Sequence, residues 1–310
     1  MSNNTKISVV SPVYNAEMII AELVRQIETA LMKITDSYEI ILVEDCGTDN
    51  SWNKIIEVCK GNSKVKGIRL SRNFGQHYAI TAGLEASSGD HVVVMDCDLQ
   101  DNPIYIQNLY KKALEGNEIV FTSKQSREHS FFKNLAARFF FSLFNYLSET
   151  QSASSSVGSY SMLSRKVVHA FCSIKDSHRH YLMILRNLGF RSAEVSITHD
   201  KRFEGKSSYT LSKLLKHAIN GITSQSDKLL RLSVTVGFVF FILACLWAVF
   251  LIVSYFEKGA FPGYTSLMAM LLFSTGMILI SIGVAGIYIG KIFEQTKNRP
   301  LYFIDEKINF

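Results

Sequence analysis

The chain has 310 residues, which is enough for one full catalytic domain and a smaller second part. Its 33 Lys+Arg against 27 Asp+Glu make it mildly basic, and because it has no long Lys/Arg run, this balance fits an anionic membrane surface or phosphorylated substrates and excludes a nucleic-acid-binding stripe. Its five scattered cysteines form no C-x-x-C pair, so they support neither a disulfide framework nor a zinc site and indicate a reducing compartment for the soluble part.

The first part of the chain alternates short apolar runs with segments of helical periodicity. Apolar runs predict strands buried on both faces at residues 7–11, 38–43, 66–70 and from 91 onward. Helical spacing predicts helices between them, at residues 20–31, 51–59 and 76–86. Asn15 is the expected N-cap of the first helix. This order predicts a mostly parallel α/β sheet with helices on both faces, followed by a helix at 104–115 and a strand at 118–123.

The strand that begins at His91 runs into two carboxylates, Asp96 and Asp98. An open α/β sheet binds its ligands outside the carboxyl ends of its strands, so these side chains are expected at the binding edge. Two hard oxygen ligands with open coordination positions suit Mg²⁺ or Mn²⁺ holding a diphosphate. The alternative is a strand followed by a solvated acidic turn.

The C-terminal third predicts two membrane spans. Residues 233–256 and 259–290 contain no charged side chain, and each run exceeds the roughly 20 residues that a helix needs to cross a bilayer. Basic residues flank the outer ends of both runs: Lys228, Arg231, Lys291, Lys297 and Arg299. The positive-inside rule therefore predicts a multi-pass protein of the cytoplasmic (inner) membrane with both termini in the cytoplasm. Residues 1–6 have no apolar stretch, so no signal peptide is expected.

Two further segments carry apolar faces, the phenylalanine-rich residues 131–147 and residues 209–222. The first is either a core helix or a helix lying on the membrane surface. Residues 299–304 predict a strand after the second span, which can pair with an exposed sheet edge. The expected division is a cytoplasmic catalytic domain (1–208), juxtamembrane helices (209–232), two transmembrane helices (233–292) and a cytoplasmic tail (293–310).

Four segments together resemble a known family: VVSPVYN (9–15), VED (43–45), NFGQ (73–76) and MDCDLQD (95–101). With the two spans, they resemble the inverting GT-A glycosyltransferases, and within these the polyprenyl-phosphate glycosyltransferases, relatives of dolichyl-phosphate mannose synthase. The bacterial members that make undecaprenyl-phosphate sugars match best. The resemblance implies a GT-A type fold, a nucleotide-sugar donor that is UDP-linked, Mg²⁺ or Mn²⁺, a polyprenyl phosphate acceptor and assembly into a homo-oligomer, a tetramer.

The family's site positions transfer to this sequence one by one. Its nucleotide-binding positions are occupied by Pro12, Tyr14, Glu17, Asp45 and Asp96. Its metal-binding positions are occupied by Asp96, Asp98 and Gln100. Its acceptor-phosphate positions are occupied by Arg127, Arg202, Lys206 and Ser207. Asp96, Asp98 and Arg202 are the expected catalytic residues. The alternative for Asp45 is a turn cap before Gly47, and the alternative for each basic residue is a solvated charge.

The sequence departs from the family at Ser159, where an aspartate considered to be a catalytic base usually stands. A second departure, Glu44 in place of the first of two aspartates, is expected to change little. An acceptor hydroxyl holds its proton at pH 7 and needs a base, whereas a phosphate monoester has a second pKa of about 6 and is largely a dianion. Loss of the carboxylate is therefore tolerable for a phosphate acceptor and damaging for a hydroxyl acceptor.

Three functions are compatible with these residues. The first is transfer of a sugar from a nucleotide-sugar to polyprenyl phosphate at the cytoplasmic face of the membrane, with inversion. The second is transfer to a hydroxyl of a glycolipid or polysaccharide. The third is an inactive membrane protein that binds nucleotide-sugar, which Ser159 alone supports and the pair of Asp96 and Asp98 opposes.

Overall fold

The computed structural model describes residues 5–124, 157–177, 179–198, 228–258 and 263–310. The chain divides into two compact units. The first comprises Met1–Glu128, Ala153–Ser207 and Arg299–Phe310, and the second comprises His129–Ser152 and Ser208–Asn298. The last residues of the chain therefore belong to the same unit as the first.

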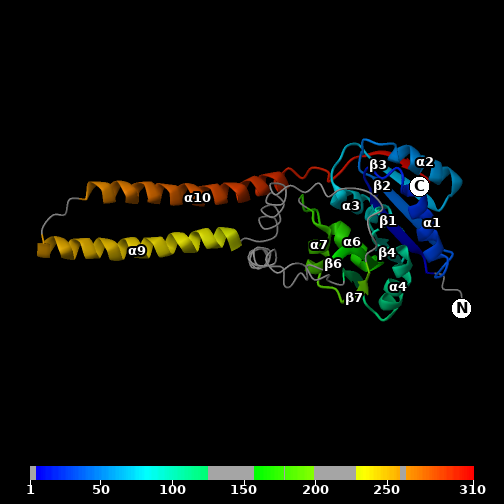
Figure 1. Cartoon of the computed structure of the whole chain (residues 1–310), viewed down its shortest axis with the longest axis horizontal. Coiled ribbons are helices and arrows are strands. Elements are labelled where there is room, and N and C mark those ends of the chain that lie inside the picture. The colour runs from blue at the N-terminus through cyan, green and yellow to red at the C-terminus, as the bar shows by residue number, and fades with distance from the viewer. Residues whose placement is uncertain (1–4, 125–156, 178, 199–227, 259–262) are drawn as a thin grey trace. The chain divides into compact units, whose positions relative to one another are not determined.

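An eight-stranded sheet forms the centre of the first unit, in the order β7-β5-β6-β4-β1-β2-β3-β8 (Figure 1). The strands are β1 (Ile7–Val13), β2 (Tyr38–Glu44), β3 (Val65–Leu70), β4 (His91–Val94), β5 (Ile119–Lys124), β6 (Val157–Ser164), β7 (Ser192–Ile197) and β8 (Ile304–Ile308). The pairings of β1 with β2, β1 with β4, β2 with β3 and β5 with β7 are parallel, and the other three are antiparallel. The expectation of a mostly parallel sheet is confirmed.

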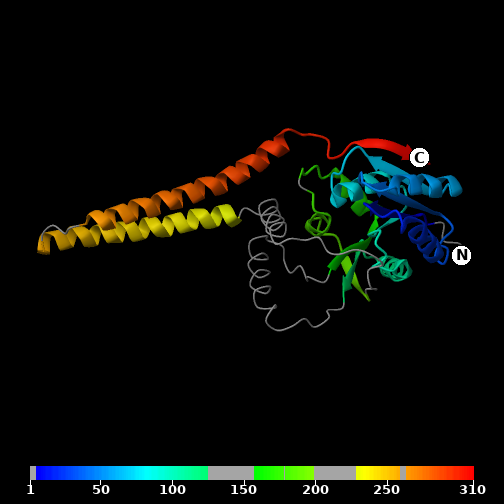
Figure 2. The ribbon, with the colours of Figure 1, turned by 45° about the horizontal axis from the view of Figure 1, so that its top comes forward.

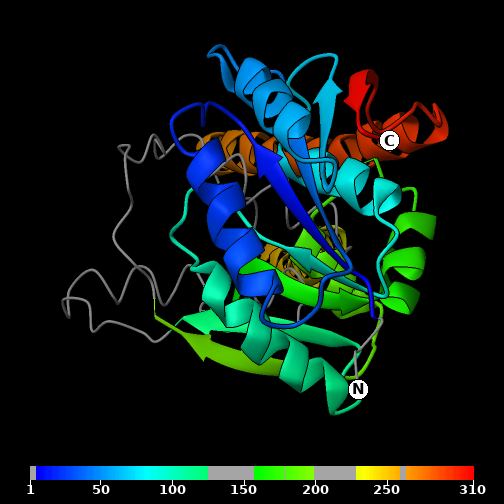
Figure 3. The ribbon, with the colours of Figure 1, turned by 90° about the vertical axis from the view of Figure 1, so that its right-hand side faces the viewer.

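Helices cover both faces of this sheet, as expected (Figure 3). One face carries α1 (Ile20–Leu31), α2 (Ser51–Gly61) and α4 (Ile106–Leu114), the last preceded by the short helix η1 (Pro103–Tyr105). The other carries α3 (Gln76–Ala86), α6 (Arg165–Ser173) and α7 (Tyr181–Asn187). Successive strand side chains point to opposite faces, so Val9 packs in the first core and Val10 in the second. This is why the strands read as continuous apolar runs in the sequence.

The approach of α3 to the sheet depends on Gly83. A Cβ at this position would lie 2.2 Å from Val10 Cγ1 and 3.1 Å from Val43 Cγ2, which is far inside van der Waals contact. Gly83 thus sets the depth at which α3 lies on β1 and β2. Because α3 follows the parallel strand β3, its N-terminal end lies at the carboxyl edge of the sheet.

The expected N-cap of the first helix is wrong. Helix α1 begins at Ile20 with Ile19 as its N-cap residue, so Asn15 is not its cap. Asn15 instead has a φ of 50°, a left-handed conformation that asparagine tolerates, and its Oδ1 accepts a hydrogen bond from Thr48 N at 2.8 Å. Tertiary bonding between two loops has replaced local capping.

The final strand β8 pairs antiparallel with β3, with Gly67 opposite Ile308 (Figure 2). The expected pairing of the tail with a sheet edge is right, but the strand lies at Ile304–Ile308 and not at 299–304. The apolar residues that suggested the earlier position serve other contacts: the Tyr302 hydroxyl bonds to Glu85. The strand itself is largely charged and exposed, which suits an edge strand.

Hydrogen bonds anchor β8 at its middle residue and at the residues on either side of the strand. Trp52 Nε1 donates to Glu306 Oε2 at 2.7 Å, and Asn309 Nδ2 donates to Cys59 O and Val65 O, both at 2.8 Å. Ser71 N donates to Phe303 O at 2.9 Å. These bonds reach helix α2 and strand β3, so the tail is an integral part of the first unit.

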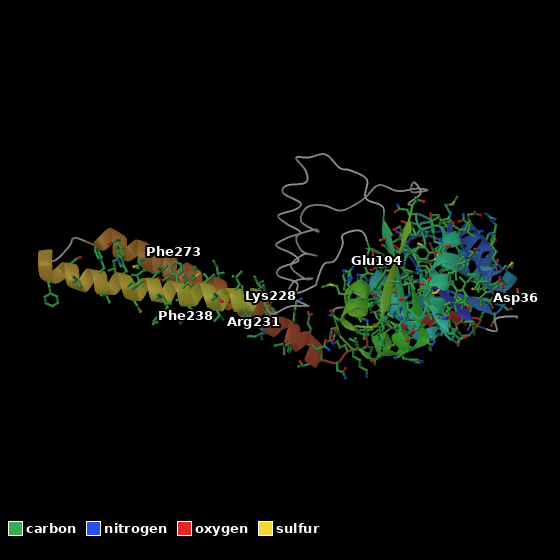
Figure 4. All side chains as sticks on the ribbon, turned by 90° about the horizontal axis from the view of Figure 1, so that it is seen from below. Asp36, Glu194, Lys228, Arg231, Phe238 and Phe273 are labelled. Atoms are coloured by element: carbon green, nitrogen blue, oxygen red, sulfur yellow. The ribbon has the colours of Figure 1, made fainter. Side chains whose placement is uncertain are left out.

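The described part of the second unit consists of two long helices, α9 (Lys228–Lys258) and α10 (Tyr264–Thr296), which lie side by side (Figures 1 and 2). Phe240 and Phe273 meet with ring centroids 5.0 Å apart. Segments Lys228–Trp247 and Phe273–Thr296 are long and apolar enough to cross a membrane. Phe238, labelled in Figure 4, is 63% exposed, as a lipid-facing side chain would be. Residues 131–147 and 209–222 lie outside the described residues.

Glu39, a buried acidic residue near the start of β2, makes the stability of the first unit dependent on pH. Burial raises the pKa of Glu39, but hydrogen bonds from Lys66, Ser8 and Ser88 outweigh it and bring the pKa down to about 2. Lys66 Nζ lies 2.8 Å from Glu39 Oε2. Because this pKa lies below the ordinary value of 4.5, the stabilisation is fully present above about pH 4.5 and is lost as the pH falls toward 2.

Glu39→Gln is therefore expected to lower the free energy of unfolding by on the order of 2–3 kcal/mol at pH 7. The difference in the free energy of unfolding between the variant and wild type should become smaller between pH 5 and pH 3, because wild type loses the same stabilisation in this range. Thermal unfolding followed by circular dichroism at several pH values measures it. Glu57→Gln is the control, since Glu57 pairs with Lys54 on an exposed helix surface and should change stability by less than about 1 kcal/mol. A difference in unfolding free energy that is as large at pH 3 as at pH 7 would contradict the lowered pKa of Glu39.

Candidate functional site

A cavity of about 380 Å³ opens at the carboxyl ends of the parallel strands. Its wall comes from the segments that follow β1, β2, β3 and β4. The lining residues are Pro12, Val13, Tyr14, Asp45, Asn73, Gly75, Gln76, Asp96, Cys97 and Asp98. Because adjacent parallel strands end at the same edge of a sheet, four loops far apart in sequence meet here.

Asp96 is held from two sides. Strand β4 ends at Val94, so Asp96 lies in the turn after it. Its Oδ1 accepts a hydrogen bond from Gln76 Nε2 at 2.6 Å, and its Oδ2 accepts one from Ser159 Oγ at 3.0 Å. Burial raises the pKa of the Asp96 carboxyl to about 6, the neighbouring carboxylates add to this, and the bonds from Ser159 and Gln76 oppose it.

Asp98 reaches the same cavity through a turn and not through a continued strand. Leu99 has a φ of 56°, and Asp98 Oδ1 accepts from Gln100 N at 3.1 Å. The turn directs both carboxylates to the cavity, whereas Gln100 is not among the lining residues. Asp96 and Asp98 thus form one acidic pair at the cavity wall.

The donor set fits a divalent cation of the magnesium type. Over the residues that the structure describes, no third histidine, cysteine or carboxylate joins the pair in a metal-ligand cluster. Mg²⁺ is typically bound through one or two carboxylates, with substrate phosphates and water filling the other positions. Two carboxylates beside an open cavity therefore suit a cation that is shared with a diphosphate.

Asp45 anchors the loop on the other side of the cavity. It follows β2, is 3% exposed, and accepts hydrogen bonds from Phe74 N at 2.7 Å and Gly75 N at 2.8 Å. Burial raises the pKa of its carboxyl, and the two backbone donors oppose that shift. Gly75 has a φ of +106°, which favours glycine. The turn cap on Gly47 is supplied by Glu44 Oε1, so Asp45 fixes the loop that leads into α3.

The remaining expected nucleotide-binding residues divide into two groups. Pro12 and Tyr14 line the cavity, and Tyr14 is 49% exposed. Glu17 does not line it: its Oε2 accepts from Asn50 N at 3.3 Å, and its own N–H donates to Asp49 Oδ2 at 3.0 Å. Glu17 therefore supports the loop after β2 without reaching the cavity.

Comparison with known proteins places this chain in a family. The sequence profile described as Glycosyl transferase family 2 matches residues 8–171, which is more than half of the chain. The chain belongs to this family. It is 33% identical over 303 residues to the uncharacterized glycosyltransferase sll0501 of Synechocystis sp., covering 97% of this chain and 95% of that protein. It is 32% identical over 308 residues to the uncharacterized glycosyltransferase YkcC of Bacillus subtilis, covering 99% and 95%.

A solved structure of similar fold is glucosyl-3-phosphoglycerate synthase from Mycobacterium tuberculosis, in complex with Mn²⁺, UDP and phosphoglyceric acid. It is 20% identical and has a TM-score of 0.51, covering 71% of this chain and 77% of that chain. At this identity the likeness concerns the fold, and it confirms the expected GT-A type architecture. The two glycosyltransferase relatives match this chain well beyond residue 171, so they share the region of the apolar helices.

Not all expected site residues of this family 2 glycosyltransferase can be placed. Arg127, Arg202, Lys206 and Ser207 lie outside the described residues. The sequence predicted no role for Gln76 of the NFGQ segment, although the first residue of a helix after a parallel strand belongs at the binding edge. The contact of Ser159 with Asp96 had no signal in the sequence beyond the unusual serine.

Proposed function

We propose that this family 2 glycosyltransferase transfers a sugar from a UDP-linked donor to polyprenyl phosphate at the cytoplasmic face of the membrane, with inversion. The observation that carries the proposal is the hydrogen bond from Ser159 to Asp96. A neutral donor stands where the resembled family has its candidate base. The three carboxylates that line the cavity have other partners: Asp45 holds a loop, Asp96 accepts from Gln76 and Ser159, and Asp98 accepts from Gln100 N. An acceptor that is already anionic fits such a site.

The donor is proposed to occupy the cavity between Tyr14 and Asp45 on one side and the acidic pair on the other. Asp96 and Asp98 would hold the Mg²⁺ or Mn²⁺, and the cation supplies charge neutralisation for the departing diphosphate. A fold neighbour was crystallised with Mn²⁺ and UDP, which supports the use of a divalent cation together with the nucleotide. Gln76 orients Asp96 by donating to Oδ1. Asp45 shapes the cavity by fixing the backbone at Phe74 and Gly75.

The acceptor phosphate is proposed to meet the basic residues Arg127, Arg202 and Lys206, with Ser207 beside them, as the family resemblance implies. A phosphate monoester is largely a dianion at pH 7, with a second pKa of about 6. The attacking oxygen therefore needs no deprotonation. It needs cations that hold it near the donor diphosphate despite the repulsion of the two anions.

Membrane attachment through two spans is part of the same proposal. Helices α9 and α10 are long and apolar enough to cross a membrane, and β8, which follows α10, pairs with β3 of the catalytic sheet. The chain before α9 and the chain after α10 therefore belong to one folded unit, which supports an even number of crossings. The basic flanks favour the cytoplasm for that unit. The homo-tetramer implied by the resemblance stays a prediction.

The test is turnover of radiolabelled UDP-sugars by the purified full-length protein in detergent, with polyprenyl phosphate and Mn²⁺ or Mg²⁺. We expect an organic-extractable, acid-labile product with one UDP-sugar, and no product when the matched polyprenol replaces the phosphate. An acid-stable product formed on polyprenol or on a glycolipid would favour transfer to a hydroxyl. Binding of UDP without turnover of any donor would favour an inactive binding protein.

The topology gives a prediction of its own. In a cysteine-free background, Gly259→Cys is expected to react with an impermeant thiol reagent added to intact cells, because residue 259 lies between the two apolar helices. Asp36→Cys should react only after the cells are opened, since Asp36 is an exposed residue of the first unit (Figure 4). The reverse labelling pattern would place the catalytic unit on the wrong side for a cytoplasmic donor.

A further inference from the structure

A chain of hydrogen bonds continues behind Asp96 into the core. Ser159 and Ser161 are separated by one residue on β6, so their side chains share a face. Ser161 Oγ donates to Ser159 O at 3.0 Å and lies 2.7 Å from the Tyr181 hydroxyl. Ser159 Oγ then donates to Asp96. The Tyr181 hydroxyl is thus connected to the acidic pair through two serines.

The direction of each bond follows from the number of protons. The Ser161 hydroxyl has one proton and gives it to Ser159 O, so the Tyr181 hydroxyl is the donor to Ser161. Tyr181 is fully buried, and its ring meets Phe171 edge-on at 5.6 Å. Burial raises the pKa of its hydroxyl far above the usual range, so it keeps its proton throughout the working pH range.

Tyr181 also contacts the start of α3, the segment that holds the other carboxylate oxygen of Asp96. Its backbone N–H points at His77 Nδ1, 3.4 Å away, and His77 follows Gln76, the residue that donates to Asp96 Oδ1. The His77 ring packs on His180, with centroids 4.5 Å apart. The first residue of α7 therefore lies against both segments that grip Asp96, β6 and the start of α3.

We propose that Tyr181 is a positioning residue for the cation and diphosphate site. Through Ser161, its hydroxyl fixes the start of β6 so that Ser159 Oγ stays aimed at Asp96 Oδ2, and the hydroxyl acts on Asp96 only through these two serines. The proposal rests on the proposed function, in which Asp96 and Asp98 hold the metal. Partners that orient metal ligands typically change metal affinity by about 10–100-fold when they are removed. Tyr181 is one bond further from the metal ligand, so its effect on metal affinity should be at or below the lower end of this range.

The experiment compares Tyr181→Phe, Ser159→Ala and the double variant in the full-length protein. Mn²⁺ is titrated in the presence of UDP and free Mn²⁺ is followed by electron paramagnetic resonance, with kcat measured separately at saturating Mn²⁺. We expect Ser159→Ala to weaken Mn²⁺ binding about tenfold and Tyr181→Phe about three- to tenfold, with kcat largely kept. In the Ser159→Ala background, Tyr181→Phe should add almost nothing, because its route to Asp96 is already cut.

Tyr38→Phe is the matched control. Tyr38 is also buried, and its hydroxyl donates to Glu28 Oε1 at 3.2 Å, far along β2 from the cavity. It should lower the unfolding temperature to a similar degree and leave Mn²⁺ affinity unchanged. If Tyr181→Phe does not fold, Ser161→Ala interrupts the same chain from β6 and carries the same expectation.

Wild-type Mn²⁺ affinity in Tyr181→Phe, or losses that multiply in the double variant, would overturn the positioning role while the proposed function stands. Failure of the wild-type protein to bind Mn²⁺ with UDP would instead refute the proposed metal site, and this inference with it.

Discussion

Asp98→Asn is expected to reduce sugar transfer by at least about a thousandfold, because a metal contributes several kcal/mol of transition-state stabilisation and each 1.36 kcal/mol is about tenfold in rate. The asparagine Oδ1 can still accept from Gln100 N, so the turn and the fold should survive. Turnover of labelled donor measures the loss, and an unchanged unfolding temperature shows that the variant is folded.

Two comparisons sharpen this expectation. Excess chelator should inactivate wild type to the same extent, since it removes the cation that Asp98 is proposed to hold. Asp36→Asn, at an exposed position of the first unit, should leave turnover unchanged. Full activity of Asp98→Asn, or of wild type in chelator, would remove the metal from the mechanism.

Asp45→Asn is expected to raise the KM for the donor by about tenfold to a hundredfold, with a smaller fall in kcat. The amide keeps one acceptor oxygen but turns an NH₂ group toward Phe74 N or Gly75 N, which now meet the carboxylate at 2.7 and 2.8 Å. Loss of a hydrogen bond to a charged group costs about 1.5–3 kcal/mol. The loop before α3 would lose its anchor, and the cavity wall would be less well ordered.

The matched control for Asp45 is Asp90→Asn. Asp90 Oδ2 also accepts a backbone hydrogen bond, from Lys6 N at 2.8 Å, but at the opposite end of the sheet. Steady-state kinetics with varied donor and direct titration with UDP measure both variants. A change in kcat alone for Asp45→Asn, without weaker binding of UDP, would contradict a role in shaping the donor cavity.

The sheet and its helices could be largely predicted from the sequence because their signals are local. Helix α3 begins and ends at the expected residues, and β1 to β4 follow the apolar runs. The errors arose where distant segments compete with local preference. Asn15 looked like a helix cap but bonds to Thr48, and the apolar residue Tyr302 looked like strand but bonds to Glu85. No local pattern encodes either partner.

The site likewise has features that local sequence predicts and features that depend on distant segments. The acidic pair was predictable because Asp96 and Asp98 follow a strongly apolar strand. The Ser159 contact was not, because β6 is inserted antiparallel between β4 and β5, and the register that puts Ser159 beside Asp96 is set by that pairing. Likewise, the acceptors for Phe74 N and Gly75 N come from Asp45 at the end of a different strand.

The position of β8 after both apolar helices has a consequence for biosynthesis. Gly67 pairs with Ile308, so the ribosome must complete both apolar helices and then β8 before the edge of β3 can be closed. During that interval the nascent catalytic unit presents an unpaired strand edge, the kind of surface at which chains associate wrongly. Closure of the sheet therefore waits until the chain beyond the two apolar helices has been made, and a polypeptide that stops before β8 never closes its sheet.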